Sequence, residues 1–194
     1  MEFHIELFDG AEELDWAGPW EVLAAWAALW PDDGATVRTV ARTTEPVVCG
    51  KGLRVLPDVS WQQAGTPDVL VYPGGRGARR ELAEPDTLRR MRELAGSGVL
   101  MTSVCTGSLV LAAAGLLDGR QATTHRSALE RLPTLGRRIE VAADDRFVDA
   151  GSVITAAGVS AGIDMALHLI ARLHSRGRAR EVRDYIQYHP DPPV

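Results

Sequence analysis

Residues 99–111 read VLMTSVCTGSLVL, and this stretch decides the fold. Residues 99–104 form an apolar run with the length of a buried central strand. A helix is expected over residues 108–117. Only Cys105, Thr106 and Gly107 separate the two elements, so the cysteine lies on a tight strand-to-helix turn. The arrangement parallels the nucleophile elbow of serine hydrolases, with cysteine in place of serine.

Such a turn favours chemistry at Cys105. It lies at the carboxyl end of a parallel sheet, where open α/β folds bind their ligands. The helix start offers unpaired N–H groups and positive partial charge, which favour the nucleophilic thiolate. We therefore expect Cys105 to be the reactive centre rather than a buried cysteine that only fills space. Cys49 lies in a predicted hairpin with no helix start after it, and we expect a structural role there.

Short β-type runs alternate with longer helical runs along the chain, which predicts one α/β domain over 1–194 with a mainly parallel sheet covered by helices. We expect a helix with Pro19 in its first turn, closed by Pro31 and Gly34. The other expected helices are 80–95, 108–117, one near residue 128, 160–174 and 179–188. The expected strands are 3–8, 36–41, 68–72, 99–104, 122–124, 139–142 and 152–156, with a hairpin over 47–55.

Composition narrows the classes of partner that this protein is expected to bind. The 194 residues carry 21 basic and 26 acidic side chains, a net charge of −5, which gives no general attraction to nucleic acid or anionic lipid. We expect a small-molecule substrate instead. The start lacks a signal peptide's basic region, and no apolar run approaches the roughly eighteen residues of a membrane span, so we expect a cytoplasmic protein without membrane contact.

The sequence shows no motif for a bound cofactor. The phosphate loop and the dinucleotide fingerprint are both absent, and the histidines lack metal-ligand spacing. We therefore expect neither a cofactor nor a metal. With two cysteines and no other sign of a stapled scaffold, free thiols are expected.

Two further features can reach the same sheet edge as Cys105. Gly74 and Gly75 end another predicted strand, and their N–H groups could meet developing negative charge, although glycine pairs after strands are often ordinary turns. Asp15 lies between the first strand and the first helix, where it could move protons or orient a water. Its alternative roles are an N-terminal cap or a first-turn charge.

Two more residues are weaker candidates. Glu21 is expected to be a solvated or helix-dipole residue unless it points inward. His125, in the run ATTHR at residues 122–126, is the best-placed histidine for acid–base work.

Taken together, these motifs resemble the ThiJ/PfpI superfamily, a branch of the class I glutamine-amidotransferase-like proteins. The cysteine block is the most specific motif for the superfamily. Within it the chain is most similar to the isonitrile hydratases, also called isocyanide hydratases, while the amidase-like sensor domains of AraC-type regulators carry similar blocks. The likeness runs nearly end to end: LD at 14–15, GP at 18–19, EV at 21–22, PGG at 73–75, TSVCTGSLVL at 102–111, AAGLL at 113–117, ATTH at 122–125 and AGID at 161–164.

The resemblance implies a flavodoxin-like three-layer sandwich, usually a homodimer, that works without a cofactor. It implies Cys105 as the nucleophile, Asp15 as its acidic partner and Thr106 beside the thiol. Substrate-binding or anion-stabilising positions fall on Gly74, Gly75, Gly158 and Val159, with Glu21 and His125 as possible supports behind them.

The implied reaction is hydration of an isonitrile to an N-substituted formamide through a thioimidate on Cys105. Alternatives are another cysteine hydrolase, a glyoxalase or deglycase, or a ligand or redox sensor, because peroxide oxidises exposed thiolates. The regulator look-alikes continue into a helix-turn-helix region, whereas this sequence stops at Val194, so direct DNA binding is not expected. Three departures from the hydratase pattern bear on the pocket: Arg126 in place of tryptophan, Ala157 in place of glycine and Ser160 in place of threonine.

Overall fold

The fold is built on a seven-stranded sheet in the order β10-β11-β7-β6-β1-β2-β5. A computed structural model describes residues 1–190. All neighbouring strands of this sheet are parallel except β10, which is antiparallel to β11. Its strands are β1 (Glu2–Leu7), β2 (Thr36–Ala41), β5 (Val59–Ser60), β6 (Val69–Tyr72), β7 (Leu100–Val104), β10 (Phe147–Asp149) and β11 (Val153–Ala156).

Two short ribbons lie outside the main sheet. The first pairs β3 (Val47–Val48) with β4 (Arg54–Val55) in the predicted antiparallel hairpin, and the second pairs β8 (Gln121–Ala122) with β9 (Glu140–Val141) in parallel. The helices are α1 (Glu13–Leu29), α2 (Ala78–Glu81), α3 (Pro85–Gly96), α4 (Gly107–Ala113), α5 (Ala161–Leu173) and α6 (Arg176–Tyr185), with single 3-10 turns η1 (Pro31–Asp33), η2 (Arg126–Ala128) and η3 (Leu132–Leu135).

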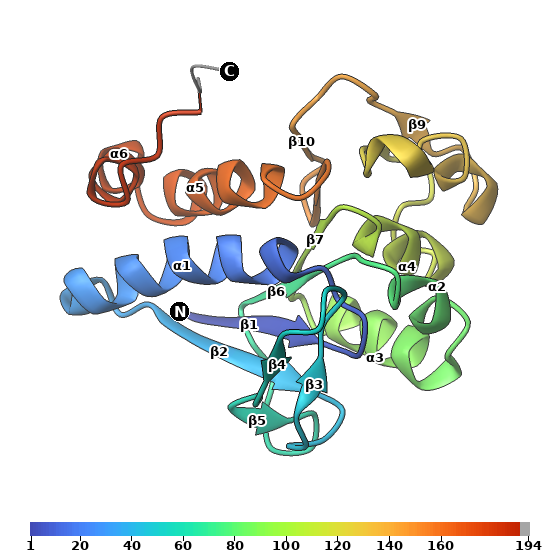
Figure 1. Cartoon of the computed structure of the whole chain (residues 1–194). Coiled ribbons are helices and arrows are strands. Elements are labelled where there is room, and N and C mark those ends of the chain that lie inside the picture. The colour runs from blue at the N-terminus through green and yellow to red at the C-terminus, as the bar shows by residue number, and fades with distance from the viewer. Residues whose placement is uncertain (191–194) are drawn as a thin grey trace.

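The helices form a layer on each side of the sheet. Helices α1 and α5 pack together over one face, with α6 against α5, whereas α3 and α4 cover the other face (Figure 1). This arrangement confirms the predicted flavodoxin-like three-layer sandwich. The expectation of one domain over 1–194 stays a prediction, and residues 191–194, including Val194, lie outside the described residues.

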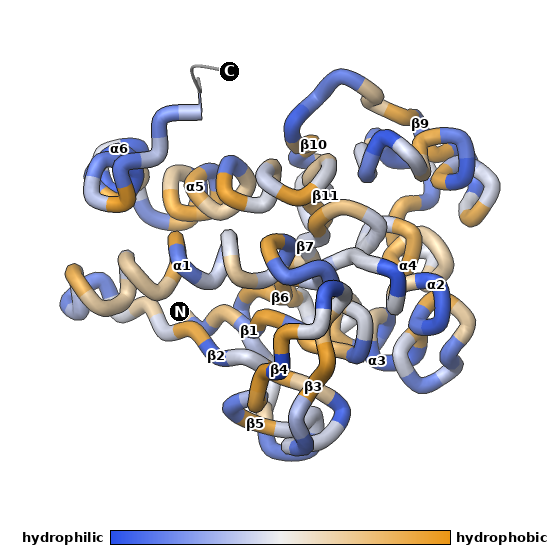
Figure 2. Tube along the Cα trace, in the orientation of Figure 1, coloured by the Kyte–Doolittle hydropathy of each residue, from blue (hydrophilic) through white to orange (hydrophobic). Residues whose placement is uncertain are grey.

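The central strands are buried on both faces and mostly apolar, as is typical of a covered parallel sheet. Ile5, Val71 and Met101 are fully buried on three neighbouring strands. Figure 2 shows hydrophobic colour along these strands and hydrophilic colour on much of the outer helices and loops. Burial of each large apolar side chain contributes about 1.5–3 kcal/mol, so these side chains are a main source of the stability of the fold.

Helix α1 begins earlier than expected, at Glu13, so Pro19 lies inside the helix rather than in its first turn. Proline has no N–H for the carbonyl four residues back, which here belongs to Asp15. Packing against α5 outweighs this cost. A Cβ on Gly162 would lie only 3.1 Å from Pro19 Cγ, which shows how closely the two helices approach.

Other boundaries also differ from the prediction. The expected helix 80–95 is two helices, because Pro85 cannot continue a helix and instead starts α3. Helix α4 stops at Ala113, before Gly115 with its φ of 81°, rather than at residue 117. Helix α6 begins at Arg176, three residues early, behind the capping side chain of Ser175. The expected helix near residue 128 is a single 3-10 turn.

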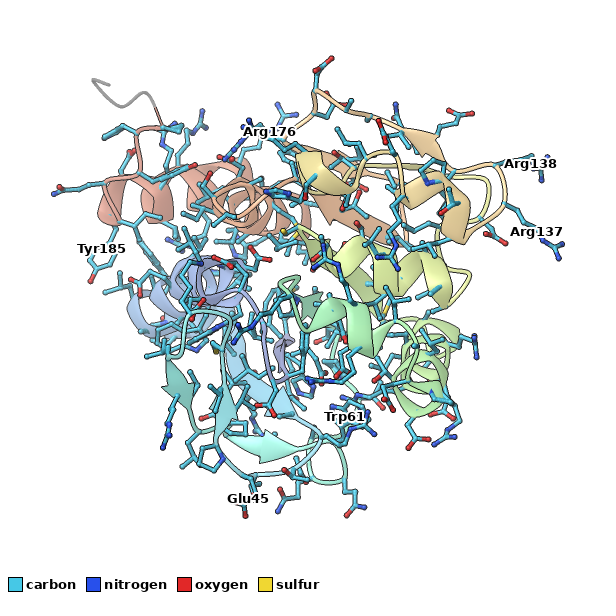
Figure 3. All side chains as sticks on the ribbon, turned by 45° about the vertical axis from the view of Figure 1, so that its right-hand side comes forward. Glu45, Trp61, Arg137, Arg138, Arg176 and Tyr185 are labelled. Carbon is cyan, nitrogen blue, oxygen red and sulfur yellow. The ribbon has the colours of Figure 1, made fainter. Side chains whose placement is uncertain are left out.

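The central strand β1 carries a buried acid, Glu6, which is 1% exposed. Trp61 Nε1 donates a hydrogen bond to it, and Arg90 Nε lies 3.8 Å from its second oxygen. The guanidinium groups of Arg42 and Arg90 lie over the Trp61 ring, which is labelled in Figure 3. Burial raises the pKa of Glu6 to about 7, against the opposing effects of Arg90 and Trp61.

This raised pKa predicts a pH dependence of folding. An unfolded glutamate has a pKa of about 4.3, so the folded state binds the additional proton and stability falls as pH rises from there through about 7. Burial of Asp15, whose pKa is also raised to about 7, acts with the same sign. We expect Glu6→Gln to flatten this decline by on the order of 2–3 kcal/mol between about pH 5 and pH 8.

Urea unfolding across that pH range measures the effect. The matched control is Glu93→Gln, because the Glu93 side chain is 68% exposed and should keep the wild-type pH dependence. A Glu6→Gln protein with the full wild-type slope would show that Glu6 does not titrate in this range.

Candidate active site

Cys105 lies on the predicted elbow, directly after β7 and before α4. Its φ of 57° is in the left-handed region that non-glycine residues rarely adopt. Hydrogen bonds hold the strained backbone on both sides. The Cys105 N–H donates to the carbonyls of Ala156 and Ala157 at 3.1 and 2.9 Å. Its carbonyl accepts from the Thr124 and Ser108 hydroxyls at 2.9 and 3.1 Å.

The loop after β6 packs directly on this elbow. A Cβ on Gly107 would lie 2.4 Å from the carbonyl oxygen of Tyr72, and a Cβ on Gly74 would lie 2.4 Å from the Thr106 nitrogen. Both distances are far below any normal contact, so only glycine fits at either position. The expectation that Gly74 and Gly75 lie beside the elbow is confirmed.

Asp15 projects into the same place from the first turn of α1. Its side chain is fully buried, and the Gly74 N–H donates to Oδ2 at 2.9 Å. Its other oxygen, Oδ1, is buried with no N–H or O–H donor among the described residues, and the carboxylate faces the Cys105 thiol. Burial raises the pKa of Asp15 to about 7, while the Gly74 N–H and the thiol oppose the rise.

The pKa of the Cys105 thiol differs from what the sequence predicts. Cys105 is 6% exposed, and burial followed by the nearby Asp15 carboxylate raises its pKa to about 12. The N–H groups of Thr106 and Val159 act in the opposite direction but do not prevail. Burial and the neighbouring carboxylate thus favour the protonated thiol, whereas the helix start favours the thiolate that the sequence predicted.

The N–H groups of the two glycines are already engaged. Gly74 donates to Asp15, and Gly75 donates to Thr106 Oγ1 at 3.0 Å. They position the acid and the threonine. The sequence allowed either a contact with developing negative charge or an ordinary turn, and an anion-stabilising role for Gly74 and Gly75 stays a prediction. The N–H groups that face the sulfur are those of Thr106 and Val159, and Val159 is itself at a φ of 46°.

The sheet edge thus gathers a thiol, a carboxylic acid and two inward-facing N–H groups within one buried elbow. A family model described as the DJ-1/PfpI family matches residues 3–172.

The chain belongs to the DJ-1/PfpI family.

Relatives within this family differ in what they do. The chain is 39% identical over 187 residues to an isonitrile hydratase of Pseudomonas putida, covering 96% of this chain and 78% of the relative. It is 30% identical to the glutathione-independent glyoxalase DJR-1.2 of Caenorhabditis elegans, covering 72% and 74%. It is 34% identical to the transcriptional regulator CdhR of Pseudomonas aeruginosa, covering 72% of this chain but only 41% of the regulator.

A solved structure shows the same fold. The crystal structure of a ThiJ/PfpI family protein from Pseudomonas syringae aligns with a TM-score of 0.89 at 32% identity, covering all of this chain and 77% of that one.

His125 lies near the elbow of this DJ-1/PfpI protein without touching the reactive pair. A Cβ on Gly158 would lie 2.5 Å from His125 Cδ2, so the ring packs against that glycine. Its Nδ1 pairs with the Ser127 hydroxyl at 2.8 Å. Among the described residues, no hydrogen bond joins His125 to Cys105 or Asp15. The acid beside the thiol is Asp15, and His125 supports the loop before Val159.

The structure does not bring Glu21 to the elbow. Glu21 is exposed and lines a surface depression with Trp20 and Leu56. Thr124, whose hydroxyl donates to the Cys105 carbonyl, was not among the predicted site residues although it lies in the ATTH motif. A hydroxyl that binds a backbone carbonyl leaves no pattern in the sequence. Cys49 is fully buried, and both cysteines are free thiols.

The departures from the hydratase pattern lie around the site rather than between its reacting groups. Arg126 is exposed, and Ala157 and Ser160 are half-buried. Ala157 contributes its carbonyl to the Cys105 N–H, a contact that does not depend on its side chain.

Within residues 1–190, no three metal-binding side chains cluster, and no helix is long and apolar enough to cross a membrane.

The contact between acid and thiol predicts a measurable shift in cysteine reactivity. Asp15→Asn removes the negative charge that raises the pKa of Cys105, so we expect iodoacetamide to alkylate the variant's thiol at lower pH than the wild-type thiol. The alkylation rate against pH, followed by mass spectrometry of the Cys105 peptide, measures this shift. The Cys49 peptide is the internal control and should keep its profile. A Cys105 profile that stays unchanged, or moves to higher pH, would contradict the assigned interaction.

Proposed function

We propose that this chain is an enzyme that hydrates isonitriles to N-substituted formamides with Cys105 as its nucleophile. The buried Asp15–Cys105 pair on a strained elbow is the observation that carries the proposal. The isonitrile hydratase from Pseudomonas putida, which is 39% identical over 96% of this chain, supports the choice of substrate class.

The chemistry of an isonitrile suits this pair. The terminal carbon of R–N≡C must gain both a nucleophile and a proton on the same atom. In the first step the Cys105 sulfur bonds to that carbon while Asp15 passes the thiol proton to the same carbon, giving the covalent thioimidate R–N=CH–S–Cys105. In the second step water adds to the same carbon, nitrogen gains a proton, the C–S bond breaks and the sulfur regains its proton. The balance is R–NC plus water to R–NH–CHO.

The electrostatics of the site support proton transfer through Asp15. Its pKa of about 7 lets it accept and return a proton near neutral pH. Because the pKa of the Cys105 thiol is about 12, attack is coupled to proton loss from the sulfur. The N–H groups of Thr106 and Val159 stabilise the negative charge that develops there. No step requires a cofactor.

Turnover of cyclohexyl isonitrile tests the proposal. We expect wild-type protein to release the formamide, Cys105→Ala to release none, and Asp15→Asn to lose about 10²- to 10⁴-fold in kcat/KM. Because the first step needs Asp15 as a carboxylate, kcat/KM should rise with pH around a midpoint near 7. Cys49→Ala is the matched control and should keep full activity. Absence of formamide from the wild-type protein between about pH 6 and pH 9 would reject the activity.

The alternatives from the sequence have separate readouts. Because the glyoxalase relative belongs to the same family, methylglyoxal is assayed beside the isonitrile, and turnover of methylglyoxal alone would reassign the reaction. The raised pKa of Cys105 weighs against a peroxide sensor, since peroxide attacks the thiolate and not the thiol.

The cytoplasmic location expected from the sequence stays a prediction.

We also propose that the chain forms a homodimer through an exposed apolar surface on α1 and around β4. The first half of α1 and the segment around β4 expose Leu14, Trp20, Leu53 and Leu56, at 40, 38, 51 and 68%. Trp20 and Leu56 line a depression of about 430 Å³. Grouped exposed apolar side chains mark interaction surfaces.

Light scattering after gel filtration tests the dimer. We expect Leu56→Glu to shift the protein to monomers, because a buried unpaired charge costs several kcal/mol. Leu29→Glu is the control, since Leu29 is 43% exposed at the opposite end of α1 and should leave the dimer intact. A wild-type protein that is monomeric at about 50 µM, or a Leu56→Glu dimer, would contradict the proposal.

A further inference from the structure

A second concave site lies between α5 and α6, away from the elbow. It has a volume of about 440 Å³ and a floor formed by Phe147, Leu167 and Ala171. Its rim on α6 consists of Arg176, Arg180 and Arg183. This trough contains none of the reacting groups of Cys105, Thr106 or Asp15. Mostly apolar concavities of this size with a few convergent polar groups are typical of small-molecule sites.

The rim arginines share one face of α6. Their spacing of four and three residues places them in a row along the helix, which is largely hydrophilic in Figure 2. Arg183 is bound to Asp184 at 2.9 Å. In the described part of the chain, Arg176 and Arg180 have neither an ion pair nor a side-chain hydrogen bond, so their guanidinium donors are free for a ligand. Figure 3 labels Arg176 at the start of this helix.

The acidic groups nearby do not neutralise these two cations. Asp164, which also lines the trough, is bound by Arg146 Nε at 2.8 Å. His168 and Arg172 are both bound to Asp149, at 2.7 and 2.8 Å. The trough therefore has a positive rim above an apolar floor, in a chain with a net charge of −5.

We propose that this trough binds an organic carboxylate with an apolar body, such as an aryl or medium-chain acid. The carboxylate lies against Arg176 and Arg180, since guanidinium groups form paired, charge-assisted hydrogen bonds with carboxylates. The apolar body lies on Phe147, Leu167 and Ala171. The volume of about 440 Å³ lies within the range of small-molecule pockets, which favours a small ligand. The site is independent of the isonitrile chemistry.

Calorimetric titration of the full chain with 2-naphthoate tests the proposal, with 2-naphthylmethanol as the neutral analogue. We expect saturable one-to-one binding of the carboxylate and at least about tenfold weaker binding of the alcohol. The double variant Arg176→Gln/Arg180→Gln should weaken naphthoate binding by about tenfold or more. Leu167→Glu, which places a negative charge on the apolar floor, should abolish it. The melting temperature of each variant shows that it remains folded.

A matched control separates local from general charge effects. Arg79 and Arg137 are also exposed arginines without an ion pair in the described residues, and Arg137 points outward on the side of the view opposite α6 (Figure 3). The double variant Arg79→Gln/Arg137→Gln changes the net charge equally and should bind naphthoate as the wild type does. Cys105→Ala should also bind normally.

Four results would overturn the site. They are the absence of saturable binding up to about 10 mM, equal affinity for the alcohol, an equal loss in the control double variant, and loss of binding in Cys105→Ala, which would place the ligand at the elbow.

Discussion

The left-handed backbone of Cys105 is the constraint on which the rest of the structure depends. A non-glycine residue in this conformation costs of order 1–3 kcal/mol, so the surroundings must hold it there. The end of β11 accepts its N–H, two hydroxyls donate to its carbonyl, and glycines at positions 74 and 107 allow the neighbouring backbones to approach. The central position of β7, between β6 and β11, brings all of these supports within reach.

Two buried acids show why an altered pKa does not by itself identify a reactive site. Burial raises the pKa of Glu6 and of Asp15 to about 7. Glu6 faces Trp61 and Arg90, which oppose the rise and tie the acid to the packing of β1 against its neighbours. Asp15 faces a thiol and keeps one oxygen free of N–H and O–H donors. The neighbouring nucleophile, and not the shift of its pKa, identifies Asp15 as a reactive group.

The sequence predicted the sheet, the elbow and the Asp15–Cys105 proximity because each depends on local patterns: apolar runs, turn glycines and the parallel order that brings strand ends together. It missed β5 and β10, which have two and three residues and too little length for a pattern. It placed Pro19 in the first turn of its helix because packing of α1 on Gly162 has no local signature. From the sequence we expected a thiolate at Cys105. The pKa of this thiol depends mainly on how deeply the side chain is buried, and burial depth is a property of the assembled fold.

Residues 122–125, about twenty positions after the cysteine, belong to the elbow for a mechanical reason. Thr124 binds the Cys105 carbonyl and is 2% exposed, while the ring of the next residue, His125, packs against Gly158. One short segment thus supports both the residue that carries the sulfur and the loop that presents the Val159 N–H to it. The elbow that carries Cys105 and the loop that carries Val159 must keep their separation. Only then does the thiol stay between Asp15 and the N–H groups of Thr106 and Val159. The histidine that looked like an acid–base group is therefore better understood as part of this support, and proton transfer falls to Asp15.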